Sequence, residues 1–173
     1  MEKVFETDLN VKGGYAVNLF ALGVPQTTVV DDIIPYHKGK PVFVGVSNDN
    51  SLWPMILEKA FAKMQGNYFH ISGGLSHMGV RYMNGAPWEI QQTKYMTSDQ
   101  IWDYISTNLS AGNTLTCGST KGSDTKKDKW GVVKGHAYTI SKVHKLKDGT
   151  RLVRARNPWG QDSYMGEYGS ESP

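Results

Sequence analysis

The first 50 residues of the chain contain short apolar segments separated by glycine and proline. Segments that are rich in valine, phenylalanine and tyrosine and bounded by such residues are typical of β-strands. We therefore expect strands at 15–21, 26–33 and 41–47. The polar segment 1–14 is expected to form an N-terminal arm.

Apolar residues then recur at intervals of three and four between Leu52 and Gln65, which predicts a helix with one buried face. Ser51 is expected to be the N-cap, Pro54 falls in the first turn, and Gly66 follows as a stop signal. The expected core stripe consists of Trp53, Ile56, Leu57, Ala60, Phe61 and Met64.

A second helix is predicted at 98–109, where apolar residues again share one side and Ala111-Gly112 follow the last turn. We expect it to pack on the same sheet as the first helix. Segment 73–87, between the two helices, contains several glycines and a proline and is expected to be a loop.

Segments 132–143 and 151–156 are predicted to be antiparallel strands, because Asp148-Gly149 favours a type I′ hairpin turn. His136 and Asn157 would then lie at the two ends furthest from the turn. His136 is about 12 residues before Asp148 and Asn157 about 9 after it, so a bulge or an offset must absorb the difference. The predicted topology therefore brings these two side chains together.

Two motifs carry the chemistry of the chain: Lys134-Gly135-His136-Ala137-Tyr138 and Asn157-Pro158-Trp159-Gly160. In a thiol protease an imidazole accepts the proton of the nucleophile, and a side-chain amide holds that imidazole in the productive tautomer. His136 and Asn157 are suited to these roles, and Trp159 would shield their hydrogen bond from water. A histidine in a strand is more often a core residue, but the neighbouring motifs favour catalysis.

These motifs, together with Val30–Pro35, Leu52–Lys63 and Tyr68–Gly74, resemble the second lobe of the calpain protease core. The resemblance spans 15–173 and implies an α+β papain-like lobe, with an antiparallel sheet or open barrel and two helices. It implies catalytic positions for His136, Asn157 and Trp159, and a C-terminally truncated lobe. The substrate-binding positions that it implies are Gly73, Gly74 and Gly135.

Cys117 is the only cysteine in the sequence, which excludes an internal disulfide. The family carries its nucleophile in a Gly-x-Cys-Trp segment, and no such segment occurs here. A nucleophilic thiol belongs at a helix N-terminus, where its pKa is lowered, whereas Cys117 lies at an expected strand end. We therefore expect Cys117 to be a buried structural residue. The polar segment 118–129 that follows is expected to be a mobile, solvated insertion, with a lid over the cleft as the alternative.

The resemblance also implies calcium binding through acidic loops after Asn-Pro-Trp-Gly. Here Asp162, Glu167 and Glu171 are present, but Ser170 stands where the similar segment has an aspartate. Calcium requires six to eight oxygen ligands, so this site looks degraded. We assign no metal-binding residue and no cofactor, and leave calcium open.

The composition, 39% hydrophobic and 11% aromatic over 173 residues, is that of a globular domain. The start lacks a signal-peptide pattern, and the sequence has no apolar run long enough to span a membrane, so we expect a cytoplasmic protein with no membrane span. The net charge of +3 is attributed to solvated faces, and nucleic acid is not expected as a partner.

Two functions remain open. In the first, the chain is the histidine–asparagine lobe of a calpain-type cysteine endopeptidase that acts on a protein or peptide substrate. The nucleophile-bearing lobe of this enzyme is then supplied in a longer precursor or as a separate subunit. Alternatively it is a catalytically inactive calpain-like module that serves a structural or interaction role in a larger assembly. In both cases the isolated chain is expected to be inactive and to need a partner for stability.

Overall fold

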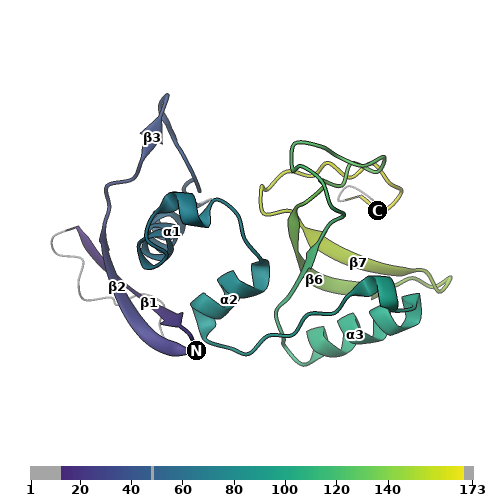
Figure 1. Cartoon of the computed structure of the whole chain (residues 1–173). Coiled ribbons are helices and arrows are strands. Elements are labelled where there is room, and N and C mark those ends of the chain that lie inside the picture. The colour runs from purple at the N-terminus through teal and green to yellow at the C-terminus, as the bar shows by residue number, and fades with distance from the viewer. Residues whose placement is uncertain (1–12, 48, 170–173) are drawn as a thin grey trace. The chain divides into compact units, whose positions relative to one another are not determined.

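The computed structural model describes residues 13–47 and 49–169, which form two compact units that divide between Trp88 and Glu89 (Figure 1). Each unit combines helices with antiparallel strands, so the predicted α+β class is confirmed, and no sheet in the described residues closes into a barrel. Most of the expected arm over 1–14 lies outside the described residues. The assignment of 15–173 to a single lobe stays a prediction.

The first unit is built on a hairpin of β1 (Gly14–Ala21) and β2 (Val24–Asp31), close to the predicted strands. Its two-residue turn places Leu22 at φ 52° and Gly23 at φ 84°. Positive φ at both positions is the type I′ geometry, which matches the twist of paired strands. This hairpin provides the surface on which the first helix packs.

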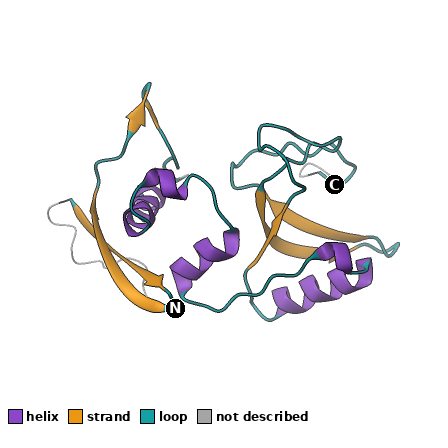
Figure 2. Cartoon of the chain, in the orientation of Figure 1, coloured by secondary structure: helices purple, strands orange, loops and turns teal. Residues whose placement is uncertain are grey.

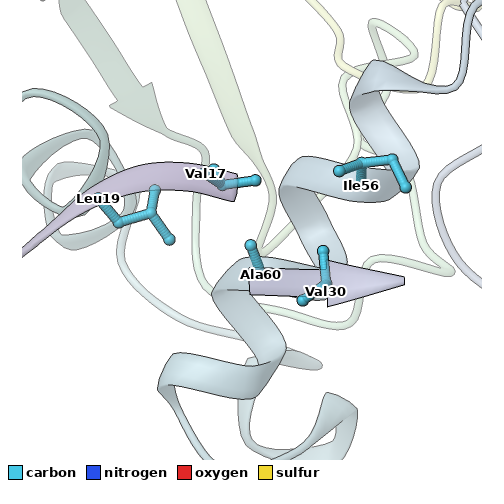
Figure 3. Packing of buried hydrophobic residues seen from close by; sticks show 5 residues of the cluster. All are labelled: Val17, Leu19, Val30, Ile56 and Ala60. Atoms are coloured by element: carbon cyan, nitrogen blue, oxygen red, sulfur yellow. The ribbon is translucent and has the colours of Figure 1, made fainter. Parts of the chain in front are cut away.

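Helix α1 (Trp53–Met64) covers one face of the hairpin (Figure 3). Alternate residues of a strand point to one face, and residues four apart share one side of a helix. The buried cluster follows both rules and consists of Val17, Leu19, Val30, Ile56 and Ala60. The apolar periodicity therefore identified the centre of this core correctly.

The start of α1 differs from the prediction. Its N-cap is Leu52, with no side-chain cap, and the hydroxyl of Ser51 bonds instead with Ser47 and Asp49. Trp53 is 51% exposed. Side chains in a helix lean toward its N-terminus. The side chain of Trp53, the first helical residue, therefore extends beyond the end of the helix and not over the sheet.

The strand expected at 41–47 is wrong. Only two-residue strands form here, β3 (Tyr36–His37) and β4 (Lys40–Pro41). The backbone N–H of Val44 donates instead to the carboxylate of Glu58 on α1, at 2.9 Å. High β-propensity gives a strand only where a neighbouring strand offers a partner, and in the described part of the chain none pairs with 42–47.

The loop expected at 73–87 contains a helix, α2 (Ser76–Asn84), which packs against β1. Gly79 lies inside it, and an interior glycine costs only about 1 kcal/mol, which tertiary packing overrides. The helix ends at Gly85 in the left-handed conformation, φ 67°. A Cβ atom on Gly85 would lie 2.6 Å from the ring of Phe20, so only glycine fits this close contact.

The second unit begins with the 3-10 turn η3 (Thr93–Tyr95) and helix α3 (Ser98–Ser110), the second predicted helix. Thr97 and Gln100 form a capping box at its start. Helix α3 packs against the strands of its own unit, whereas α1 packs against β1 and β2, so the prediction of a shared sheet is wrong. Periodicity indicates that a helix buries one face, but not which sheet covers it.

The sheet of the second unit has the order β5-β6-β7 and is antiparallel (Figure 2). Its strands are β5 (Leu115–Gly118), β6 (Ala137–Lys145) and β7 (Arg151–Arg156). Strand β6 begins five residues later than expected, because the chain turns at Gly131 (φ 81°) and Gly135 (φ 55°). The predicted hairpin between β6 and β7 is present.

The turn of this hairpin differs in type from the prediction. Gly149 has φ 94° and donates its N–H to the carbonyl of Leu146, whereas Asp148 does not have the positive φ that a type I′ turn requires. This is the longer hairpin loop that ends in a left-handed glycine.

No helix within the described residues is long and apolar enough to cross a membrane.

Candidate active site

A β-bulge brings His136 and Asn157 to the same end of the β6–β7 hairpin. The register shifts between Ile140 and Lys142, which leaves Ser141 as the extra residue, and the Ser141 hydroxyl donates to the carbonyl of Arg154 at 3.3 Å. The extra residue takes up one of the three residues by which His136 is further from the turn than Asn157, and the remaining two are an offset beyond the last pair, Thr139 with Arg156. The predicted need for a bulge or an offset is confirmed.

His136 Nε2 lies 2.9 Å from Asn157 Oδ1, so the predicted hydrogen bond is present. Two further bonds fix the amide: the backbone N–H of Trp159 donates to Oδ1 at 3.0 Å, and Nδ2 donates to the carbonyl of Gln161 at 3.3 Å. Because a carbonyl oxygen only accepts hydrogen bonds, the neutral imidazole must carry its proton on Nε2. Nδ1 then has a lone pair available to accept a proton.

Two aromatic rings contact the imidazole of His136. The ring of Trp159 lies 4.4 Å away between centroids, and that of Tyr138 lies 5.0 Å away in an edge-on arrangement. Trp159 is 51% exposed, so it covers the imidazole while leaving part of its own surface to solvent. The predicted neighbourhood of Trp159 and the dyad is therefore present.

Gly135 is required by the backbone immediately before His136. It has φ 55°, and a Cβ atom here would lie 2.1 Å from the carbonyl oxygen of Gly122. Its N–H donates to the carbonyl of Thr120 at 2.8 Å. Steric contact with Gly122 therefore requires glycine at position 135, whatever its other roles. The predicted role of Gly135 in substrate binding stays a prediction.

The polar segment 118–129 is attached to the chain that leads into β6. The N–H of Ser119 donates to the carbonyl of His136 at 2.9 Å, and the N–H of Lys134 donates to the carbonyl of Lys126 at 2.9 Å. Lys127 also forms an isolated bridge with Val133. Composition did not reveal these contacts, because they use backbone groups that every residue carries.

The comparisons with known proteins cover the whole chain. Residues 1–173 match the family described as calpain family cysteine protease. The chain belongs to this family.

Its relatives include the calpain-type cysteine protease DEK1 of Zea mays, 36% identical over 180 positions, which covers 99% of this chain and 8% of the relative. The human calpain-1 catalytic subunit is 31% identical over 186 positions, with 99% of this chain and 25% of the relative covered. Human calpain-9 is 31% identical over 151 positions, with 84% and 22% covered. The chain therefore spans a quarter or less of the length of these calpains.

Cys117 does not have the environment of a calpain nucleophile. It lies in β5 opposite Tyr138 and is exposed by surface area, so the expected burial is wrong. The reason is its position near the end of a short strand, where little packs over the side chain. The atoms that do surround the thiol partly desolvate it and raise its pKa, which disfavours the reactive thiolate.

Gly73 and Gly74 lie in the first unit, between the 3-10 helix η2 (Tyr68–Ile71) and α2. Both are exposed, and a Cβ atom at either position would meet no other atom within 4 Å. Local packing therefore does not require glycine here. Their place along a substrate cleft, which the calpain resemblance implies, stays a prediction.

Among the described residues, the acidic side chains after the Asn-Pro-Trp-Gly motif interact with their own neighbours. Asp162 accepts a hydrogen bond from the backbone N–H of Tyr164 at 2.9 Å, and Glu167 raises the pKa of Tyr168 by its charge. Within 13–47 and 49–169, no three histidine, cysteine or acidic side chains are grouped so as to hold a metal ion. Ser170 and Glu171 lie outside the described residues.

Proposed function

We propose that the second unit supplies the general base and its orienting amide to a calpain-type cysteine endopeptidase, with the nucleophile provided by another polypeptide segment. The observation that carries this proposal is the 2.9 Å hydrogen bond between His136 Nε2 and Asn157 Oδ1. Asn157 is itself held by Trp159 and Gln161, so the pair is fixed before any substrate binds.

In the proposed reaction, Nδ1 of His136 accepts the proton of the incoming cysteine thiol, and the thiolate attacks the carbonyl carbon of the peptide bond. The resulting imidazolium donates this proton to the leaving amine. His136 then deprotonates a water molecule, which hydrolyses the thioester and regenerates the thiol. Asn157 holds the imidazole in place through both steps, because its Oδ1 accepts a hydrogen bond from Nε2–H.

The cysteine, and the groups that stabilise the oxyanion formed when the thiolate attacks the peptide carbonyl, would come from a partner segment. Cys117 is unsuited to be the nucleophile, because its thiol pKa is raised where a nucleophile requires a lowered one. The first unit also exposes a short run of apolar side chains, Val42, Phe43, Val44 and Val46, which a partner would shield from water.

This exposed run favours a second candidate function. A calpain-like module without its nucleophile can act as a structural or interaction subunit, in which the partner is permanent and the dyad is unused. The two candidates share the geometry of His136 and Asn157 and differ only in whether a thiol reaches Nδ1. A complementation assay separates them.

For this assay, the chain is mixed with, or joined to, the cysteine-bearing protease segment of a calpain relative, and hydrolysis of a fluorogenic peptide is followed. We expect activity in the complex that falls roughly 100-fold or more in His136→Ala, the scale of general acid–base catalysis. The matched variant Cys117→Ala should keep full activity. A bound complex with no turnover would favour the interaction module, and turnover by the isolated chain that Cys117→Ala abolishes would contradict both candidates.

The need for a partner has its own test. Size-exclusion chromatography with light scattering on the isolated chain should show association or incomplete folding, because the apolar run at 42–46 is exposed. A well-folded monomer that melts cooperatively would contradict the partner requirement while leaving the proposed dyad chemistry intact.

A further inference from the structure

We propose that Ser119 is a positioning residue for His136: its hydroxyl fixes the backbone of His136 so that the imidazole reaches Asn157. The catalytic significance of this role rests on the function proposed above. The structural claim itself concerns only the geometry of the dyad.

The position of Ser119 follows from the register of the sheet. Strands β5 and β6 pair Gly118 with Ala137, so the next antiparallel pair is Ser119 with His136. The backbone N–H of Ser119 donates to the carbonyl of His136 at 2.9 Å and continues the ladder. The return bond differs, because the N–H of His136 donates to the hydroxyl of Ser119, at 2.9 Å, in place of a backbone carbonyl.

The departure from regular pairing has a local cause. The chain turns at Gly135, which has φ 55° and donates its N–H to the carbonyl of Thr120. At the same point the hydroxyl of Ser119 accepts the N–H of His136. It thus takes the place of a backbone carbonyl at the residue where the ladder ends.

A single hydroxyl also satisfies both peptide groups of His136. Ser119 Oγ accepts from the His136 N–H at 2.9 Å and donates to the His136 carbonyl at 3.1 Å. A serine or threonine hydroxyl offers one donor and two acceptor lone pairs, which this arrangement needs, whereas alanine and valine offer neither. The chemistry at this position is therefore specific to a hydroxyl group.

The other side of His136 lacks such support. The pairing of β6 with β7 ends at Thr139 and Arg156, so in the described structure His136 and Asn157 both lie beyond it. The imidazole reaches Asn157 across this unpaired end, while the backbone that carries it is held from the β5 side by Ser119. Loss of the Ser119 hydroxyl is therefore expected to act on the dyad itself.

The test uses the chain with ¹⁵N-labelled histidine, bound to the partner segment of the complementation assay in a variant whose cysteine is replaced by alanine, because the measurement needs a folded dyad but no nucleophile. In the wild-type chain the ¹⁵N shifts of His136, assigned with His136→Gln, should show the Nε2–H tautomer and a slowly exchanging Nε2 proton. Ser119→Ala should lose this signature and exchange the proton at least about tenfold faster. Ser119→Thr should retain the signature, whereas Ser119→Val, which matches threonine in shape without a hydroxyl, should lose it. Ser123→Ala, in the same segment, is the matched control and should behave as wild type.

Two results would overturn the proposal: a wild-type signature in both Ser119→Ala and Ser119→Val, or its loss in Ser119→Thr while the protein remains folded. If the variants without a hydroxyl fail to fold, amide exchange in the wild-type chain decides. The backbone amide of His136 should be protected from exchange by its hydrogen bond to Ser119 Oγ. An unprotected amide would refute the positioning role of Ser119. Failure of the complementation assay with an intact Ser119 effect would reject the proposed function alone.

Discussion

The indole ring of Trp159 lies 4.4 Å from the imidazole ring of His136, at an interplanar angle of 48°. The same residue donates its backbone N–H to the Asn157 oxygen that His136 binds. Trp159 therefore supports the dyad with its backbone and covers it with its side chain. These two contributions can be separated, because substitution of the side chain leaves the backbone N–H in place.

Trp159→Ala is expected to open the His136–Asn157 hydrogen bond to water. Exchange of the Nε2 proton should accelerate by about threefold to tenfold, the scale of a neutral hydrogen bond worth about 1 kcal/mol. Proton exchange measured by NMR checks this expectation. Trp130→Ala is the matched control, because Trp130 is similarly exposed, at 50%. Equal exchange rates in the two variants would show that the indole does not shield the bond.

Three glycine substitutions should destabilise the second unit in a graded order. Gly118→Ala meets open space and no positive φ, so its effect should be small. Gly149→Ala meets open space at φ 94° and should cost about 1–2 kcal/mol of backbone strain. Gly135→Ala adds the 2.1 Å clash with Gly122 to its positive φ and should cost more than either. Urea unfolding measures all three, and a Gly135→Ala cost no larger than that of Gly149→Ala would argue against the close packing at Gly122.

Glu58→Gln should stabilise the first unit at neutral pH. Burial is the largest effect on this carboxyl group and raises its pKa, although the hydrogen bond from Val44 lowers it. A carboxyl group with a raised folded-state pKa favours folding below its unfolded pKa of about 4.3, and loses that contribution as the pH rises through the folded value. The variant should therefore melt at a higher temperature than wild type at pH 7, with the gap closing near pH 3.5.

Glu89→Gln is the control for this experiment, with the opposite sign. Hydrogen bonds from Gln91 and Tyr104 lower the pKa of Glu89, so its stabilising effect is present above its unfolded pKa and is lost as the pH falls. Glu89→Gln should thus reduce stability slightly at pH 7 and have no effect near pH 3.5. Shifts of the same sign in both variants would contradict the opposite environments of the two carboxyl groups.

Cys117 should react slowly with iodoacetamide for a solvent-exposed thiol. Partial desolvation raises its pKa, so at pH 7 the thiolate fraction is smaller than in a free cysteine. The rate measured against pH should show its inflection above that of a model thiol. An inflection below it would indicate an activated thiol and reopen the question of Cys117 as a nucleophile.

The sequence predicts the dyad because two local signals agree. Asp148-Gly149 marks the turn between two strand-like segments, and the turn defines which residues lie at the far ends. His136 and Asn157 lie there in the structure, although the turn is of a different type from the one predicted. Topology depends on the presence of a turn more than on its type, so the error does not propagate to the site.

Other features depend on contacts that side-chain patterns do not encode. Helix α2 contains Gly79 and forms where it can pack against β1, which local propensity does not show. Segment 42–47 has strong β-propensity but pairs with no strand in the described structure. Ser119 contacts His136 through backbone groups and one hydroxyl, so it resembles any other loop serine in the sequence.

The bulge at Ser141 divides β6 into two stretches that differ in phase by one residue. Ile140 pairs with Ala155 and Val143 with Val153, two positions apart on β7, so Ile140 and Val143 share one face although they are three apart in the sequence. Deletion of Ser141 would give an unbroken ladder with the same pairs, so Ile140 and Val143 would stay on that face and only the bulge, with its bond from Ser141 to Arg154, would be lost. The bulge thus adds one residue between His136 and the hairpin loop without changing which side chains of β6 share a face.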